Sequence, residues 1–101
     1  MKDKVEVRYK ELVELNSKDS PSTGTIVCYD GSYFEKTDEF AQEFIEISDC
    51  YHKVKLHRAT HDSLKDWQEK IDKLVVALIK YRIHLSKNRD EINEIIERSD
   101  V

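Results

Sequence analysis

The sequence predicts an α+β fold, in which a short N-terminal antiparallel β-meander or hairpin precedes a middle helix and a long, heptad-patterned C-terminal helix. Three observations predict it. Residues 4–15 alternate apolar and polar side chains, residues 25–36 hold two β-rich runs around an Asp-Gly pair, and an apolar stripe runs between residues 64 and 95. A period of two is typical of a half-buried strand, whereas alternating spacings of three and four are typical of a helix that packs along one side.

Size and composition predict one folded domain over residues 1–101. Apolar residues make up 39% of the chain and charged residues 38%, and 17 basic residues face 21 acidic ones, which gives a net charge of −4. Disordered chains usually combine a large net charge with few apolar residues, so this composition indicates a folded chain. The negative sign argues against nucleic acid as a partner, because unspecific binding depends on an excess of Lys and Arg.

The cysteine content and the hydropathy pattern predict a soluble, cytoplasmic protein without a membrane partner. Cys28 and Cys50 are too few for the disulfide framework of a small secreted domain, so we expect free thiols in a reducing compartment. No apolar stretch approaches the ~18 residues of a membrane span. The N-terminal residues 1–10 lack the apolar core of a signal peptide.

The N-terminal part, residues 4–36, reads as strands. Odd positions from Val5 to Leu15 are apolar with one exception, and even positions are polar with one exception. The loop signals of residues 16–24 follow, and Asp30-Gly31 then suggests a tight hairpin turn between two short strands. A helix would also align some apolar residues of the first segment, and this alternative stays open.

The middle part, residues 38–58, reads as a helix, with Thr37 as its N-cap. Its apolar residues fall at spacings of four and three, at Phe40, Phe44, Ile47, Tyr51 and Val54. Acidic residues gather near its start and basic residues near its end, which suits the helix macrodipole. A competing interpretation makes His52–Arg58 a strand through Val54 and Leu56.

The strongest pattern predicts a long helix over residues 62–98, separated from the middle helix by a break near residues 59–62. A single rod interrupted by a stutter is the alternative. Spacings of three and four persist over ten positions, of which only Asn88 is polar. The nine apolar positions, which we expect to form an interaction surface, are Leu64, Trp67, Ile71, Leu74, Leu78, Tyr81, Leu85, Ile92 and Ile95.

The long helix is expected to mediate self-association as a homodimer or a higher oligomer, in a helical hairpin or coiled-coil-like arrangement. Residues 74–79 are apolar on nearly all sides, and Ile83 extends this surface, so the segment requires burial against several elements. Asn88 at a core heptad position could fix the register between paired helices. Alternatively, it lies at a frayed or solvent-facing point.

The candidate metal ligands are Cys50, His52, His57 and His61. Zinc takes cysteine and histidine in tetrahedral sets, so the residue types are suitable. Their spacing matches no familiar zinc pattern, and histidines near a helix C-terminus are favoured by the dipole alone. We therefore expect a solvated helix end with neither metal nor cofactor, and no catalytic cysteine.

Two further surfaces have both a functional and a structural interpretation. The basic run at Lys80, Arg82, His84, Lys87 and Arg89 could contact nucleic acid or an acidic partner, but a solvated helix face is the preferred interpretation. The aromatic residues Tyr29, Tyr33 and Phe34 could form an exposed interaction patch. A contact between sheet and helix is the preferred interpretation of these aromatics.

The sequence thus suggests a non-enzymatic regulatory protein, an adaptor or inhibitor, that binds itself and another protein. The absence of a recognisable catalytic motif, combined with an excess of helix-pairing surface, leads to this hypothesis. One alternative is a small-ligand or metal-binding protein with a site between protomers. The other is a nucleic-acid-associated dimer that uses residues 80–89.

Overall fold

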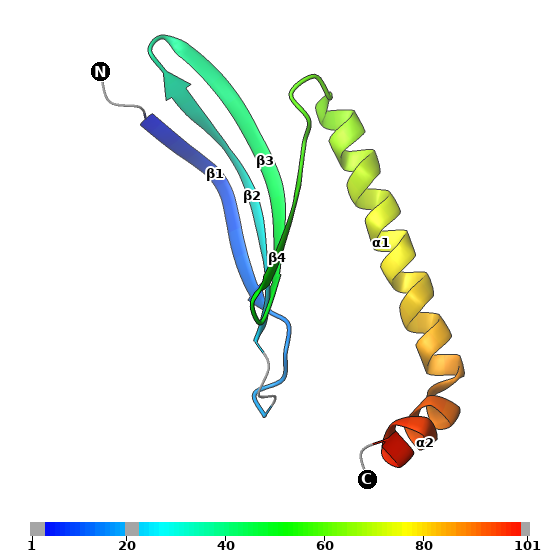
Figure 1. Cartoon of the computed structure of the whole chain (residues 1–101). Coiled ribbons are helices and arrows are strands. Elements are labelled where there is room, and N and C mark those ends of the chain that lie inside the picture. The colour runs from blue at the N-terminus through cyan, green and yellow to red at the C-terminus, as the bar shows by residue number, and fades with distance from the viewer. Residues whose placement is uncertain (1–3, 20–22, 100–101) are drawn as a thin grey trace. The chain divides into compact units, whose positions relative to one another are not determined.

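The computed structural model describes residues 4–19 and 23–99, so that part of the predicted loop lies outside the described residues. It contains an N-terminal four-stranded antiparallel sheet followed by two helices, which confirms the α+β class (Figure 1). The elements are β1 (Lys4–Glu14), β2 (Gly24–Glu35), β3 (Asp38–Asp49), β4 (His52–His57), α1 (Leu64–Lys87) and α2 (Arg89–Ser99). Two compact units, residues 1–63 and residues 64–101, contain the sheet and the helices respectively, and each is described by itself.

The sheet is a meander with the strand order β1-β2-β3-β4, in which each strand pairs antiparallel with the next (Figure 1). β1 confirms the strand expected over residues 4–15, and β2 is one strand where two short strands were expected. β4 confirms the competing interpretation of residues 52–58 as a strand through Val54 and Leu56.

The predicted helix over residues 38–58 is wrong, because this segment forms β3 and β4. Side chains four apart share one face of a strand as well as one face of a helix, so Phe40 and Phe44 fit both structures. The next step of three places Ile47 on the opposite face of β3, together with Ile45. The acidic and basic ends reflect cross-strand pairing instead, since Lys53 Nζ lies 3.9 Å from Glu46 Oε1.

The expected turn at Asp30-Gly31 is also wrong, because both residues lie inside β2. The register between β1 and β2 shifts here through a β-bulge between Val7 and Tyr9. A Cβ on Gly31 would come within 2.6 Å of the Glu6 carbonyl oxygen, so glycine permits the close approach of the two strands.

The two hairpin turns lie where the sequence gives no glycine signal. Residues 36 and 37 join β2 to β3, and residues 50 and 51 join β3 to β4. Lys36 and Cys50 adopt positive φ angles of 60° and 54° at the first position of each turn. Thr37 is therefore a turn residue and not a helix N-cap.

The two faces of the sheet differ in character. Because directly paired residues share a face, the register defines an aliphatic face and an aromatic face. The aliphatic face carries Ile26, Cys28, Ile45, Ile47 and Leu56, and the aromatic face carries Tyr29, Tyr33, Phe40 and Phe44. Ile45 is the most buried apolar residue of the sheet, with 8% of its surface exposed.

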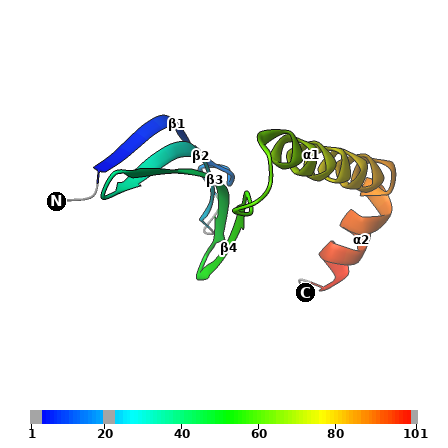
Figure 2. The ribbon, with the colours of Figure 1, turned by 90° about the horizontal axis from the view of Figure 1, so that it is seen from above.

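The predicted helix over residues 62–98 is two helices, which part at Asn88. The Asn88 side-chain amide donates to the His84 carbonyl oxygen at 3.0 Å, so it satisfies the end of α1. α2 turns away from the axis of α1 (Figure 2), and this break rules out one uninterrupted heptad rod. Neither helix of the described chain is long and apolar enough to cross a membrane.

Candidate functional site

A cluster of two arginines and two carboxylates holds the sheet together on its aliphatic face. At its centre Glu43 is buried, with 6% of its side chain exposed, and Arg58 Nε donates to its Oε1 at 2.5 Å. The same guanidinium donates to the carbonyl oxygens of Ala41 (3.0 Å), Ala59 (3.1 Å) and Asp62 (2.9 Å). Arg58 therefore joins β3 to the segment that follows β4, and the charge of Glu43 is compensated in place.

Arg8, the residue at the bulge of β1, supplies the second arm of this cluster. Its guanidinium donates to Asp30, to the Ser32 hydroxyl at 2.7 Å and to the Gly31 carbonyl at 2.8 Å. Arg8 Nη2 also lies 3.5 Å from Glu43 Oε2. The hydrogen bonds from Arg8 lower the pKa of the Asp30 carboxyl below its ordinary value. Each of the four charged side chains in this cluster is thus paired with another member, which leaves no unpaired acid or base among them. We interpret the cluster as structural and call it the clamp.

The aromatic face carries two stacked rows of rings that run across the strands. Tyr29 and Phe44 stack with their ring centres 4.7 Å apart, and Tyr33 and Phe40 stack at 5.1 Å. In the first row, Lys55 of β4 continues the stack, with its Nζ 4.0 Å from the centre of the Phe44 ring.

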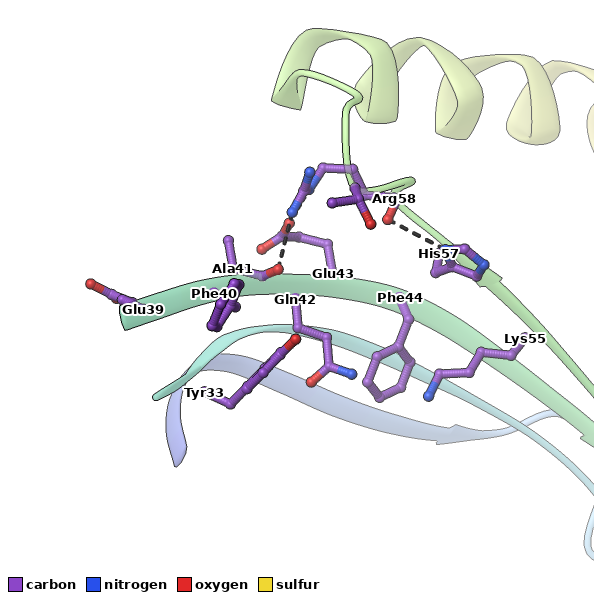
Figure 3. Close-up of a pocket in the computed structure, with 11 residues that line it drawn as sticks. Tyr33, Glu39, Phe40, Ala41, Gln42, Glu43, Phe44, Lys55, His57 and Arg58 are labelled. Carbon is purple, nitrogen blue, oxygen red and sulfur yellow. Dashed lines mark hydrogen bonds and ion pairs between the residues drawn. The ribbon is translucent and has the colours of Figure 1, made fainter. Parts of the chain in front are cut away.

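A cavity of about 440 Å³ lies at the end of the second row. Figure 3 shows how β3 separates its lining, with Arg58 and Glu43 on one side of the strand and Tyr33, Gln42 and Phe44 on the other. Its walls consist of aromatic rings, the backbone of β3 and charged side chains. This mixture suits an extended, partly charged ligand better than a small apolar one.

The four candidate metal ligands do not converge. Cys50 lies in the turn before β4 and His57 at the far end of that strand, which is roughly 20 Å of extended chain away. His52 is the first residue of β4, and His61 lies beyond the strand. The described residues hold no group of three or more His, Cys, Asp or Glu side chains placed to bind a metal ion. The interpretation of these residues as a cationic helix end is wrong, because no helix lies there.

The predicted interaction stripe lies on α1 and α2, and its exposure varies along the chain. Trp67 is buried, and Ile71, Leu74 and Ile92 are half-buried. The remaining members are exposed: Leu64, Leu78, Tyr81, Leu85 and Ile95. The basic run of residues 80–89 is exposed throughout at its charged positions.

Sequence reasoning missed the clamp and the stacked rows. Arg8 and Glu43 are ordinary polar positions in their segments, and Arg58 read as the basic end of a helix. A signal was present in Asp30-Gly31, because an Asp-Gly pair inside a long β-rich run also fits a strand opposite a bulge. Comparisons with protein-family models, with curated proteins and with solved structures found no match to this chain.

Proposed function

We propose that the chain is a non-enzymatic regulatory protein, an adaptor or inhibitor in the cytoplasm, that associates with itself through its helices. The observation that carries the proposal is the exposure of α1 along the predicted stripe. Leu78, Tyr81 and Leu85 are 56%, 61% and 37% exposed. Soluble proteins rarely leave a continuous apolar surface of this kind without a partner.

A second apolar stripe on α1 supports an assembly in which the helix packs against more than one neighbouring element. Val75, Ile79 and Ile83 follow one another at four-residue spacing and are 46%, 52% and 46% exposed. At 3.6 residues per turn they lie roughly 120° round the helix from the heptad stripe. α1 can therefore pack against two elements at once.

The energetics favour the use of both stripes. Complete burial of a large aliphatic side chain is worth about 1.5–3 kcal/mol, so these half-exposed residues gain about 1 kcal/mol each. Three such side chains from each of two chains together contribute roughly 6 kcal/mol on burial. Association itself costs ~4–15 kcal/mol, so this contribution lies near the lower limit of the cost. The second stripe doubles the gain and makes a stable complex attainable.

The charge distribution favours a contact between α2 of one copy and the last part of α1 of the other. The last part of α1 is basic at Lys80, Arg82 and Lys87, whereas α2 carries four carboxylates against two arginines. A contact between the acidic α2 of one copy and the basic part of α1 of the other would pair these charges. Exposed ion pairs add little affinity, so these charges affect the relative orientation of the two copies more than the dissociation constant.

The test is sedimentation velocity on the full chain and on two matched double variants. Leu78→Gln with Leu85→Gln removes two stripe residues, and Glu69→Gln with Lys73→Gln makes the same number of changes at exposed positions outside the stripes and outside the basic part of α1. Four lost side chains per dimer, at about 1 kcal/mol each, predict a dissociation constant roughly a thousandfold higher for the first variant. Equal behaviour of both variants would contradict the proposed interface.

A further inference from the structure

The first part of β3 has an edge that no other strand covers within the described residues, and the clamp contacts this edge at the Ala41 carbonyl. β4 pairs with residues 44–49 of β3 and ends opposite Phe44. The earlier residues of β3, from Asp38 to Gln42, have no strand on that side within the described part of the chain. The cavity of Figure 3 lies along this stretch and is lined by Phe40, Ala41 and Gln42.

The neighbouring row shows what a strand at this position would contribute. Over residues 44–49, β4 places the ammonium of Lys55 on the ring of Phe44, which is stacked on Tyr29. Phe40 is stacked on Tyr33 in the same way, but β4 ends before it reaches this row. Phe40 is therefore left 40% exposed on the side where Lys55 covers its neighbour.

The backbone of this stretch can accept a further strand. Arg58 N–H donates to the Glu43 carbonyl at 3.0 Å, so residues 43, 41 and 39 direct their backbone groups toward this edge. The Ala41 carbonyl already receives Arg58 Nη2 at 3.0 Å. A carbonyl oxygen has two lone pairs, so an added strand can share it while it pairs fully with residue 39.

The charges around the edge select the chemistry of the occupant. The exposed residues 35–39 carry three carboxylates, on Glu35, Asp38 and Glu39, against one ammonium, on Lys36. Of the cations that line the cavity, Arg58 is paired with Glu43, and Lys55 lies on the Phe44 ring. A second copy of this edge would bring the same carboxylates and repel the first. A phosphate backbone would be repelled for the same reason. A basic segment is attracted by both the carboxylates and the face of the ring.

We propose that an extended, basic segment of another protein adds to β3 along residues 38–42 and places a Lys or Arg side chain on Phe40. The added strand continues the line of β4, and its basic side chain repeats the contact between Lys55 and Phe44. Main-chain hydrogen bonds provide affinity in this mode, and the side-chain contact provides specificity. The inference rests on the proposed function in that the chain acts by binding a protein, but it uses the sheet and not the helices.

Fluorescence anisotropy with the full chain tests the proposal. The probe is a labelled peptide of alternating lysine and valine, which copies the pattern of β4, and its control has glutamate in place of lysine. The lysine peptide is expected to bind and the glutamate peptide to fail. Phe40→Ala is expected to weaken binding about tenfold, as loss of a cation–π contact of about 1–2 kcal/mol implies. The matched control Tyr51→Ala removes a fully exposed aromatic from the turn between β3 and β4 and should leave binding unchanged.

Several outcomes would overturn the proposal. The first is an equal affinity of the lysine and glutamate peptides, and the second is an equal loss of affinity in Phe40→Ala and Tyr51→Ala. The third is displacement of the lysine peptide by a thymidine oligonucleotide. Far-UV circular dichroism checks the fold of each variant, and Phe40→Leu replaces Phe40→Ala if the latter unfolds. The Leu78→Gln, Leu85→Gln variant separates the two proposals, because it should lose self-association and keep peptide binding.

Discussion

Replacing Arg58 by Met is expected to destabilise the sheet by about 3 kcal/mol. The substitution keeps the aliphatic stem and removes a guanidinium that donates to Glu43 and to three carbonyl oxygens. Removing one partner of a buried ion pair costs about 3–5 kcal/mol, because the other charge stays buried. Arg58 and Glu43 are 14% and 6% exposed, so solvent screens the pair little. Arg8 still lies 3.5 Å from Glu43, which places the cost near the lower limit.

Urea denaturation followed by far-UV circular dichroism measures this cost. All variants are compared at one protein concentration, because self-association raises the apparent stability. A loss of 3 kcal/mol in a chain of this length corresponds to a fall in Tm on the order of 10–20 °C. The control is Arg98→Met, which removes a guanidinium from an exposed position near the end of α2.

A double-mutant cycle tests the reasoning behind that number. Glu43→Leu combined with Arg58→Met removes both charges, so the double variant should lose less stability than the sum of the single variants. We expect a coupling of at least 1.5 kcal/mol. Additive losses, or a loss under 1 kcal/mol for Arg58→Met alone, would refute the assignment of the cluster as a buried clamp.

Three further predictions concern the sheet. Gly31→Ala should cost 2 kcal/mol or more in urea denaturation, because the new Cβ would lie about 2.6 Å from the Glu6 carbonyl oxygen; an unchanged midpoint contradicts this close approach. Lys36→Gly should raise the free energy of unfolding by about 1 kcal/mol, since it relieves a positive φ of 60°; a loss of stability argues against that turn. The lowered pKa of Asp30 gives stability that is present above the ordinary value of 3.8 and is lost as the pH falls through the lower folded-state value. Asp30→Asn should therefore flatten the acid limb of a stability–pH profile, and an unchanged limb contradicts the role of Arg8.

The strands that the sequence predicts well are those with one dominant pattern. β1 alternates with one exception in each set of positions, so a period of two predicts it. β4 has Val54 and Leu56 two apart, but the strand was only the competing interpretation of a segment for which a helix was preferred. β3 carries apolar residues on both faces, such as Phe44 and Ile45, and its combined pattern imitates the three–four spacing of a helix. The turns at Lys36 and Cys50 were not predictable, because each places a non-glycine residue at positive φ.

The helical part was predicted in position and extent, but not in its division. Asn88 fits the heptad spacing, yet its side chain hydrogen-bonds the end of α1 and marks the break. The clamp could not be predicted, because it joins Arg8, Glu43 and Arg58 from distant segments, and their convergence depends on the register of the sheet. The solvated helix end expected at the candidate metal ligands depended on a helix over residues 38–58 and lost its geometric basis with that helix.

The most direct test of self-association is the absolute molar mass of the full chain, measured by light scattering across a dilution series. We predict a mass that is a multiple of 12.0 kDa at high concentration and that falls toward the single-chain value on dilution. A constant mass of 12.0 kDa at every concentration would contradict the central claim. The exposed stripe of α1 would then have to pack against the sheet of the same chain or await a different protein.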